Sequence, residues 1–150
     1  TLAGAIVLEC VGYTAPTRGS QGAPPGLPIP VPPDGDFLAV VGNDRSAGLV
    51  QAVTRAAGSL PGFKAVPLVV PGKGEVFPDC RRSDHAAFWE YGYSAVMLTD
   101  TANFRNPHYH QATDTLDTLD LDFMVGVAKV VAGTVADVAR SSHAVRPGDV

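Results

Sequence analysis

The sequence is poor in cysteine and has no excess of basic residues, and both shortages exclude classes of protein. Its two cysteines, Cys10 and Cys80, are too few for a disulfide scaffold and lack zinc-ribbon spacing. They could form one disulfide bond or remain as buried free thiols. With 11 Lys and Arg residues against 15 Asp and Glu, the net charge of -4 gives no electrostatic reason to bind nucleic acid.

Long apolar runs are missing too, so we expect no membrane span. The longest candidate, residues 123–138, contains two glycines, Lys129 and Asp137, whereas a span needs roughly 20 apolar residues. The 150 residues, of which 45% are hydrophobic, can bury one core. The chain begins without Met or a signal peptide and enters an apolar run at once. We therefore expect one domain, or an excised part of a larger one.

Apolar segments of strand and helix type alternate along the chain. Strands are predicted at residues 5–10, 37–41, 66–70 and 94–99, and helices at residues 49–58, at 86–91, and from Asp120 or Asp122 to about residue 140. Asn43, Asp44 or Ser46 could cap the first helix, and Ser83 with Asp84 the second. Pro67 places its strand at an edge, or marks the strand start. The pattern predicts an α/β fold with a mainly parallel sheet flanked by helices.

A proline-rich stretch lies at about residues 16–36 and contains Pro24, Pro25, Pro28, Pro30, Pro32 and Pro33. These prolines are incompatible with a helix or the interior of a sheet, so we expect an extended surface loop. A domain boundary is the alternative. Because the residues before it are too few to fold alone, an excursion within one domain is preferred.

Polar residues follow several of the predicted strands or begin a helix: Glu9, Asp84, Asp100 and His110. In open α/β sheets, ligands bind beyond the carboxyl ends of the strands. Residues 106–115 add a dense cluster of two histidines, a tyrosine and an aspartate, in a chain with only four histidines. Such a loop could serve a zinc-dependent hydrolytic site, or it could be ordinary polar loop chemistry.

Three stretches occur in an order that resembles a known superfamily: Leu8-Glu9-Cys10, Ser83-Asp84-His85 followed by Phe88, and Tyr109-His110 followed by Asp114-Thr115. The set resembles the carboxyl-terminal half of the co-catalytic zinc aminopeptidases, whose superfamily includes glutaminyl cyclases and transferrin-receptor-like ectodomains. The resemblance covers nearly the whole chain. It implies a zinc-exopeptidase-like fold in which residues 1–150 form the carboxyl-terminal portion of a peptidase domain.

The resemblance also implies roles for individual residues. Glu9 would be the carboxylate ligand of one zinc and His110 the imidazole ligand of the other, while Tyr109 would donate a hydrogen bond to the tetrahedral oxyanion. Asp84 and His85 would line the site or support its ligands, and Asp114 would hold His110 by a hydrogen bond. From the residues alone, other roles stay open: Glu9 or Asp84 as a helix cap, His110 bonded to Asp114 without metal, Tyr109 as a packed aromatic, and His85 as a structural residue.

The function implied is a zinc-dependent aminopeptidase that removes N-terminal residues from peptide substrates and uses two zinc ions. In the superfamily, a His-x-Asp pair, a metal-bridging aspartate and a Glu-Glu pair precede the Leu-Glu strand, and this sequence does not contain them. We therefore expect the chain alone to bind zinc weakly, to be inactive, and to self-associate through surface that a missing part would cover. The alternatives are a single-zinc acyltransferase like glutaminyl cyclase and a non-catalytic binding domain. Related enzymes are often exported, which favours an exported protein.

Overall fold

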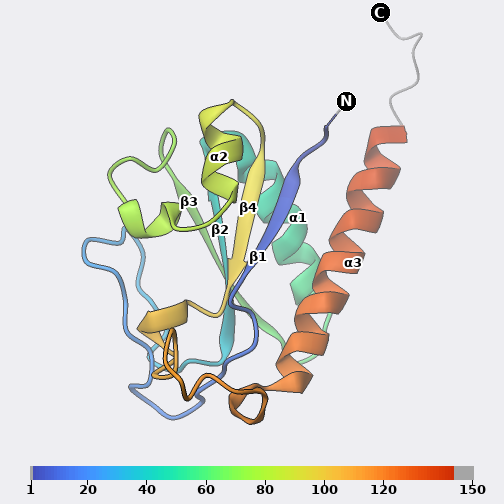
Figure 1. The fold of residues 1–150 in the computed structure, drawn as a ribbon. Helices are drawn as coiled ribbons and strands as arrows, with labels where there is room; N and C mark the ends of the chain where they lie inside the picture. The colour runs from blue at the N-terminus through green and yellow to red at the C-terminus, as the bar shows by residue number, and fades with distance from the viewer. Residues whose placement is uncertain (1, 144–150) are drawn as a thin grey trace, which may run out of the picture.

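The computed structural model describes residues 2–143, and its centre is a four-stranded sheet (Figure 1). The strands are β1 (Ala5–Glu9), β2 (Phe37–Asn43), β3 (Lys64–Val70) and β4 (Ala95–Thr99), arranged in the order β1-β4-β2-β3. β1 pairs in parallel with β4, and β2 with β3, whereas β2 and β4 are antiparallel. The predicted α/β fold with a mainly parallel sheet is confirmed, with one antiparallel pairing at its middle.

The antiparallel pairing decides where the strand ends lie. β1 and β4 end together at one end of the sheet, with Glu9 opposite Thr99 in the register. β2 and β3 end at the opposite end, where Asn43 pairs with Val70. The carboxyl ends of the strands therefore do not share one location, and only β1 and β4 have their carboxyl ends at the Glu9 end.

Helices and loops cover the two faces of the sheet (Figure 1). α1 (Ala47–Gly58) and α3 (Leu121–His143) pack on one face against Leu38 and Val40 of β2 and Leu98 of β4. The opposite face carries α2 (His85–Glu90), a short 3-10 helix (Pro78–Arg81) and part of the proline-rich stretch. Neighbouring residues of β2 and β4 thus serve two separate cores, as the alternation of side chains along a strand requires.

Side-chain hydrogen bonds at the helix starts confirm two of the three capping predictions. The Asn43 side chain accepts hydrogen bonds from the Ser46 amide (3.1 Å) and hydroxyl (2.6 Å), so Asn43 caps the 3-10 helix Asp44–Ser46 that leads into α1. Asp120 accepts a hydrogen bond from the Phe123 amide (2.9 Å) at the start of α3. The predicted cap at α2 is wrong, since Asp84 makes no side-chain capping bond. Its backbone is already helical (φ -59°, ψ -25°), whereas a capping side chain needs extended backbone.

The proline-rich stretch is the predicted loop within the domain. An isolated bridge between Ala15 and Gly35 closes its base, and neither helix nor strand interrupts it. Pro67 lies in β3 at an edge of the sheet, as predicted, where a missing N–H leaves no ladder bond unmade.

Two further expectations concern cysteines and membrane spans. Cys10 and Cys80 are both free thiols, so no disulfide bond joins them. Within residues 2–143, no helix is long and apolar enough to cross a membrane.

Candidate functional site

Glu9 is the last residue of β1 and its carboxylate is held from both sides. Oε2 accepts a hydrogen bond from the Ser83 hydroxyl (2.8 Å), and Oε1 accepts one from the Cys10 thiol (3.3 Å). The side chain is half-buried. Burial, the bond to Glu9 and the nearby carboxylates raise the pKa of the Cys10 thiol to about 12, so this group stays protonated and donates. Ser83 is thus the link between the Ser-Asp-His segment and the β1 end, a role that local sequence did not reveal.

Asp100 follows β4 and organises the loops beneath Glu9. Its carboxylate accepts hydrogen bonds from the backbone amides of Gly12 (3.1 Å), Tyr13 (2.8 Å) and Ala102 (2.9 Å), while its own amide donates to the Cys10 carbonyl (2.6 Å). Burial raises the pKa of Asp100 above its ordinary value, although the amide bonds act in the opposite direction. Asp100 ties the β1 loop to the β4 loop and so sets the position of Glu9 relative to the residues that follow β4.

Tyr109 and His110 lie in the turns that follow the 3-10 helix Ala102–Phe104. Their rings stack, with centroids 3.9 Å apart and planes inclined by 15°. Tyr109 is half-buried, whereas His110 is exposed and has left-handed backbone (φ +58°). In this region His108 bonds to Thr113 (Nδ1 to Oγ1, 3.0 Å).

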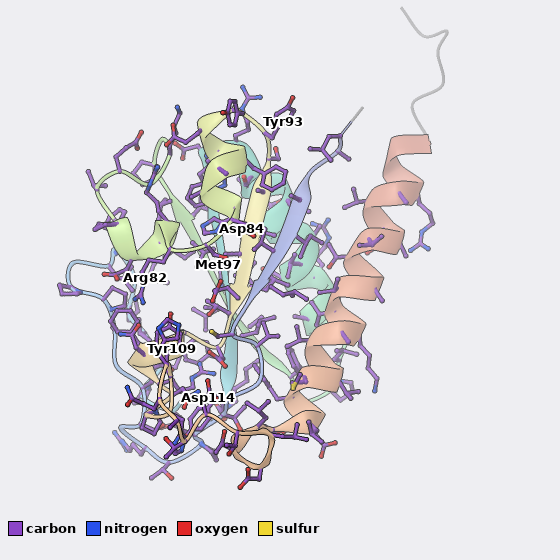
Figure 2. All side chains as sticks on the ribbon, in the orientation of Figure 1. Arg82, Asp84, Tyr93, Met97, Tyr109 and Asp114 are labelled. Carbon is purple, nitrogen blue, oxygen red and sulfur yellow. The ribbon has the colours of Figure 1, made fainter. Side chains whose placement is uncertain are left out.

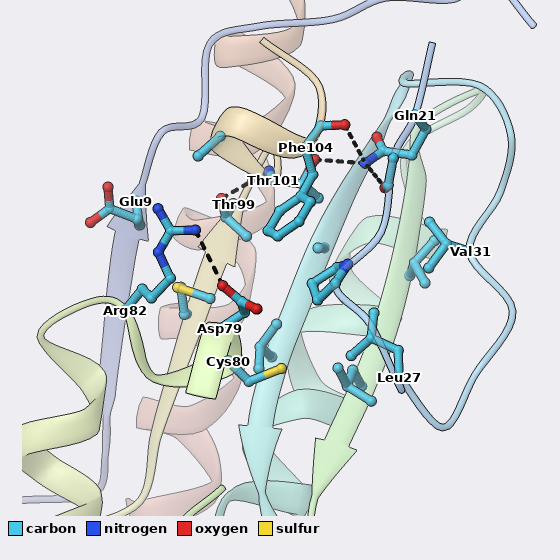
Figure 3. Close-up of a pocket in the computed structure, with 18 of the residues that line it drawn as sticks. Glu9, Gln21, Leu27, Val31, Asp79, Cys80, Arg82, Thr99, Thr101 and Phe104 are labelled. Carbon is cyan, nitrogen blue, oxygen red and sulfur yellow. Dashed lines mark hydrogen bonds and ion pairs between the residues drawn. The ribbon is translucent and has the colours of Figure 1, made fainter. Parts of the chain in front are cut away.

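Glu9 and Tyr109, far apart in sequence, line the same cavity. Figure 3 shows this cavity, with Glu9, Asp79 and Arg82 on one side and Leu27 and Val31 on the other. Arg82 bonds to Asp79 (3.4 Å) and to the Asn103 side chain (2.8 Å). Figure 2 shows Tyr109 and Asp114 on the loops below the sheet, and Asp84 above them at the start of α2.

Three of the predicted site residues, His85, Asp84 and Asp114, do not line this cavity. His85 is fully buried: its Nε2 bonds to the Cys80 carbonyl (2.8 Å), and its ring meets the Trp89 ring edge to face at 4.5 Å. This environment supports the structural role of His85 over a role in lining the site. Asp84 and Asp114 are exposed, and the structure contains no hydrogen bond between Asp114 and His110. The orienting role of Asp114 stays a prediction.

Metal-ligating side chains do not form a complete site within residues 2–143. No group of three or more His, Cys, Asp and Glu side chains in this part of the chain could hold a metal ion. Glu9 and His110 offer one carboxylate and one imidazole, of the types that zinc prefers, but a catalytic zinc takes about three protein ligands. The described residues alone therefore do not fit a closed zinc site.

Known proteins share parts of this sequence. The chain is similar to the uncharacterized protein YfbL of Escherichia coli (strain K12), with 37% identity over 131 residues, which is 87% of this chain and 39% of that protein. It is similar to a probable leucine aminopeptidase of Arthroderma otae, with 44% identity over 63 residues, 41% of this chain and 17% of that protein. The chain thus spans well under half the length of these relatives.

Solved structures share the fold. LapB from Legionella pneumophila superposes with a TM-score of 0.60 at 17% identity, covering 89% of this chain and 31% of that chain. The LapA aminopeptidase of the same organism gives a TM-score of 0.57 at 16% identity, covering 92% and 31%. The family model described as "Peptidase family M28" matches residues 40–135, more than half of the sequence. With this match, the predicted resemblance is confirmed: the chain belongs to peptidase family M28.

Proposed function

We propose that this chain is the carboxyl-terminal portion of a zinc-dependent aminopeptidase domain, which hydrolyses the N-terminal residues of peptides. One observation carries the proposal: the Glu9 carboxylate and the Tyr109 side chain line a single cavity, with His110 stacked on Tyr109. Membership of the M28 peptidases and similarity to a probable leucine aminopeptidase support the same activity. We also propose that the protein is exported, as related enzymes often are.

In this proposal Glu9 and His110 would each hold a different zinc ion, and the other ligands would come from residues outside this sequence. When bound, zinc polarises the scissile carbonyl and lowers the pKa of a water molecule. Ser83 presents the Glu9 carboxylate by bonding to one of its oxygens, which leaves the other oxygen with only the weak thiol donor. Asp114, four positions beyond His110, orients that imidazole once the loop adapts to the loaded site.

Tyr109 contributes at the reacting carbonyl. Its hydroxyl donates a hydrogen bond to the oxyanion that develops as the carbonyl carbon becomes tetrahedral. The half-buried ring, stacked on His110, restricts where the hydroxyl can point. Such a donor stabilises the transition state more than bound substrate, so it acts on the rate of the chemical step.

The test uses the full-length protein, not the 150 residues alone. Treatment with a chelator should abolish the hydrolysis of a leucyl anilide, and added zinc should restore it. His110→Ala should lower both zinc affinity and kcat by a factor of about 100 or more, because a metal ligand matters at least as much as the groups around it. His108→Ala, in the same loop, is the matched control and should keep most of the activity.

Unchanged activity in His110→Ala would contradict the assignment of His110. Product analysis with a peptide that begins with Gln separates this proposal from its closest rival. Free glutamine supports an aminopeptidase, whereas a pyroglutamyl peptide as the only product identifies an acyltransferase.

A further inference from the structure

Arg105 is a buried cation whose contacts are with neutral groups. Only 5% of its surface is exposed, and burial lowers the pKa of its guanidinium to about 10, although Asp100 and Asp36 act in the opposite direction. Within residues 2–143 it forms no ion pair, and its buried Nη2 atom has no hydrogen-bond partner there. Burying a charge without a counter-ion costs free energy, so stability alone does not explain an arginine at this position.

The guanidinium joins segments that are distant in sequence. Nε donates to the Gln21 side chain (Oε1, 2.7 Å) in the proline-rich stretch, and Nη1 donates to the Tyr13 carbonyl (3.3 Å) in the loop after β1. The guanidinium carbon lies 4.5 Å from the centre of the Phe37 ring, at the start of β2. A Cβ atom at Gly35 would come within 2.9 Å of the Arg105 side chain, so a larger residue there would displace it. One side chain therefore holds these segments together.

Gln21 extends this contact to the 3-10 helix Ala102–Phe104. Because its Oε1 atom accepts from Arg105, its amide nitrogen is free to donate to the Thr101 hydroxyl (2.8 Å). Figure 3 shows the Gln21 side chain directed at this turn. Thr101 and Ala102 both have left-handed backbone (φ +78° and +47°), although neither is glycine. Such strained conformations persist only where neighbouring contacts hold them, and the Gln21 bond is one of these contacts.

A short path leads from Arg105 to Tyr109. Asn106, the next residue, is buried; its amide donates to a carbonyl of the preceding 3-10 helix (2.7 Å), and its own carbonyl accepts from the Tyr109 amide (3.3 Å). The Asn106 side chain accepts from the His108 amide (2.8 Å). The His108 ring in turn meets the Tyr13 ring edge to face, with centroids 6.1 Å apart. The turn that carries Tyr109 is thus built on residues that Arg105 fixes.

We propose that Arg105 is a positioning residue for the peptidase reaction, and that it holds the loop of Tyr109 so that the Tyr109 hydroxyl meets the oxyanion. The inference rests on the proposed function. Arg105 does not line the cavity, so it acts through Gln21 and Asn106 and not by contact with substrate. An arginine suits this position because its planar guanidinium donates in fixed directions to two acceptors at once, which the ammonium group of lysine does not reproduce.

The test is a double-mutant cycle on the zinc-loaded full-length protein, with a leucyl anilide as substrate. Arg105→Lys should lower kcat at least about tenfold and change KM by less than about threefold, because a small misplacement of a catalytic group acts on the chemical step. The same substitution at an exposed arginine of α1, Arg55→Lys, is the control and should change neither constant.

The second arm of the cycle combines Arg105→Lys with Tyr109→Phe. Once the hydroxyl is absent, its position no longer matters, so Arg105→Lys should lower kcat by less than about twofold further. Rates are compared per folded enzyme, with the folded fraction taken from circular dichroism. Independent effects of the two substitutions on kcat would overturn the inference. So would a variant that is less stable but has the wild-type kcat, because that is the result of a purely structural role.

Gln21→Ala keeps the proposal testable if Arg105→Lys does not fold. This variant breaks the link to the Thr101 hydroxyl and leaves Arg105 in place. It should also lower kcat, and by a smaller factor when Tyr109→Phe is present. A wild-type kcat in Gln21→Ala, or the same factor in both backgrounds, would contradict the positioning role.

Failure of the proposed function is recognised separately. If the wild-type protein hydrolyses no anilide with zinc present, the aminopeptidase proposal fails, and the loop is then tested by amide hydrogen exchange without substrate. Arg105→Lys should speed exchange of the Gly22 and Tyr109 amides at least about tenfold and leave the amides of β2 unchanged, because only the loop opens. Equal acceleration in β2, or none in the loop, would refute the inference.

Discussion

Ser83 is the contact through which a distant segment controls the Glu9 carboxylate. Replacing it by alanine removes the 2.8 Å hydrogen bond and leaves the Glu9 carboxylate with only the weak Cys10 thiol donor. We predict that Ser83→Ala lowers zinc affinity of the full-length protein by about 10 to 100-fold, the usual effect of losing a group that orients a metal ligand. Competition with a chromophoric chelator measures this. Ser59→Ala, at the end of α1, is the control, and equal affinities in the two variants would argue against the role of Ser83.

Tyr109 should act on the rate more than on binding. Tyr109→Phe keeps the ring that stacks on His110 but removes the hydroxyl. We expect kcat to fall by about 10² to 10³, the effect of losing one oxyanion donor, with a smaller change in KM. Steady-state kinetics of the zinc-loaded full-length protein give both constants. A rise in KM with kcat intact would show that the hydroxyl only binds substrate.

His85 makes stability depend on pH. Burial lowers the pKa of His85 below its ordinary value of 6.5. Between that value and the lower pKa in the folded state, the unfolded chain binds more protons, so stability falls as pH decreases below about 6.5. In His85→Gln, urea unfolding should depend less on pH over this interval. The same pH dependence in both proteins would assign the effect to another group.

The sequence suggested candidate site residues more readily than the bonds between them. Glu9, Tyr109 and His110 were chosen because each stands at a recognisable place in an ordered set of motifs, and their roles stay predictions. The bond from Ser83 to Glu9 and the three amides that hold Asp100 join residues far apart in sequence, which no local pattern encodes. His85 was open between two roles, and packing against Trp89 supports the structural one.

At the scale of elements, the start of α3 depends on Asp120. Its carboxylate caps the helix and accepts a hydrogen bond from the Thr14 hydroxyl (2.6 Å), and both bonds lower its pKa, the Thr14 bond most. Asp120→Ala should decrease the free energy of unfolding by about 1 kcal/mol, the typical value of a helix cap. Denaturant unfolding at neutral pH measures it. Asp122→Ala, in the first turn of the same helix, should change stability by only a few tenths of a kcal/mol.

The direction of strands was harder to predict than their existence. Apolar runs located all four strands and the three main helices, but β2 extends two residues further than predicted because Gly42 and Asn43 still pair with β3. Alternation of strands and helices also favoured a mainly parallel sheet, without indicating which pair of strands would be antiparallel. β4 instead runs against β2, and hydrophobic periodicity carries no information on this choice.

For the whole molecule, the two edges of the sheet differ. β3 carries Pro67, whereas β1 has neither proline nor lysine and exposes half of Leu8. Unprotected edges pair with other chains, so we predict that the isolated 150-residue chain forms dimers or larger species as its concentration rises. Light scattering coupled to size exclusion should show this, and Leu8→Lys should shift the chain towards monomer. Val76→Lys, at an exposed valine away from this edge, is the control and should leave the association unchanged. A wild-type chain that stays monomeric would contradict the prediction.

The bridge between Ala15 and Gly35 has a consequence for how such a protein can change over time. It closes residues 16–34 into one excursion, and the exposed positions within it, such as Pro28 and Pro30, can change without disturbing the strands that end at Glu9 and Thr99. Long surface loops tolerate changes in length at little thermodynamic cost. The exposed part of this excursion is therefore a natural place for related proteins to differ in length and composition.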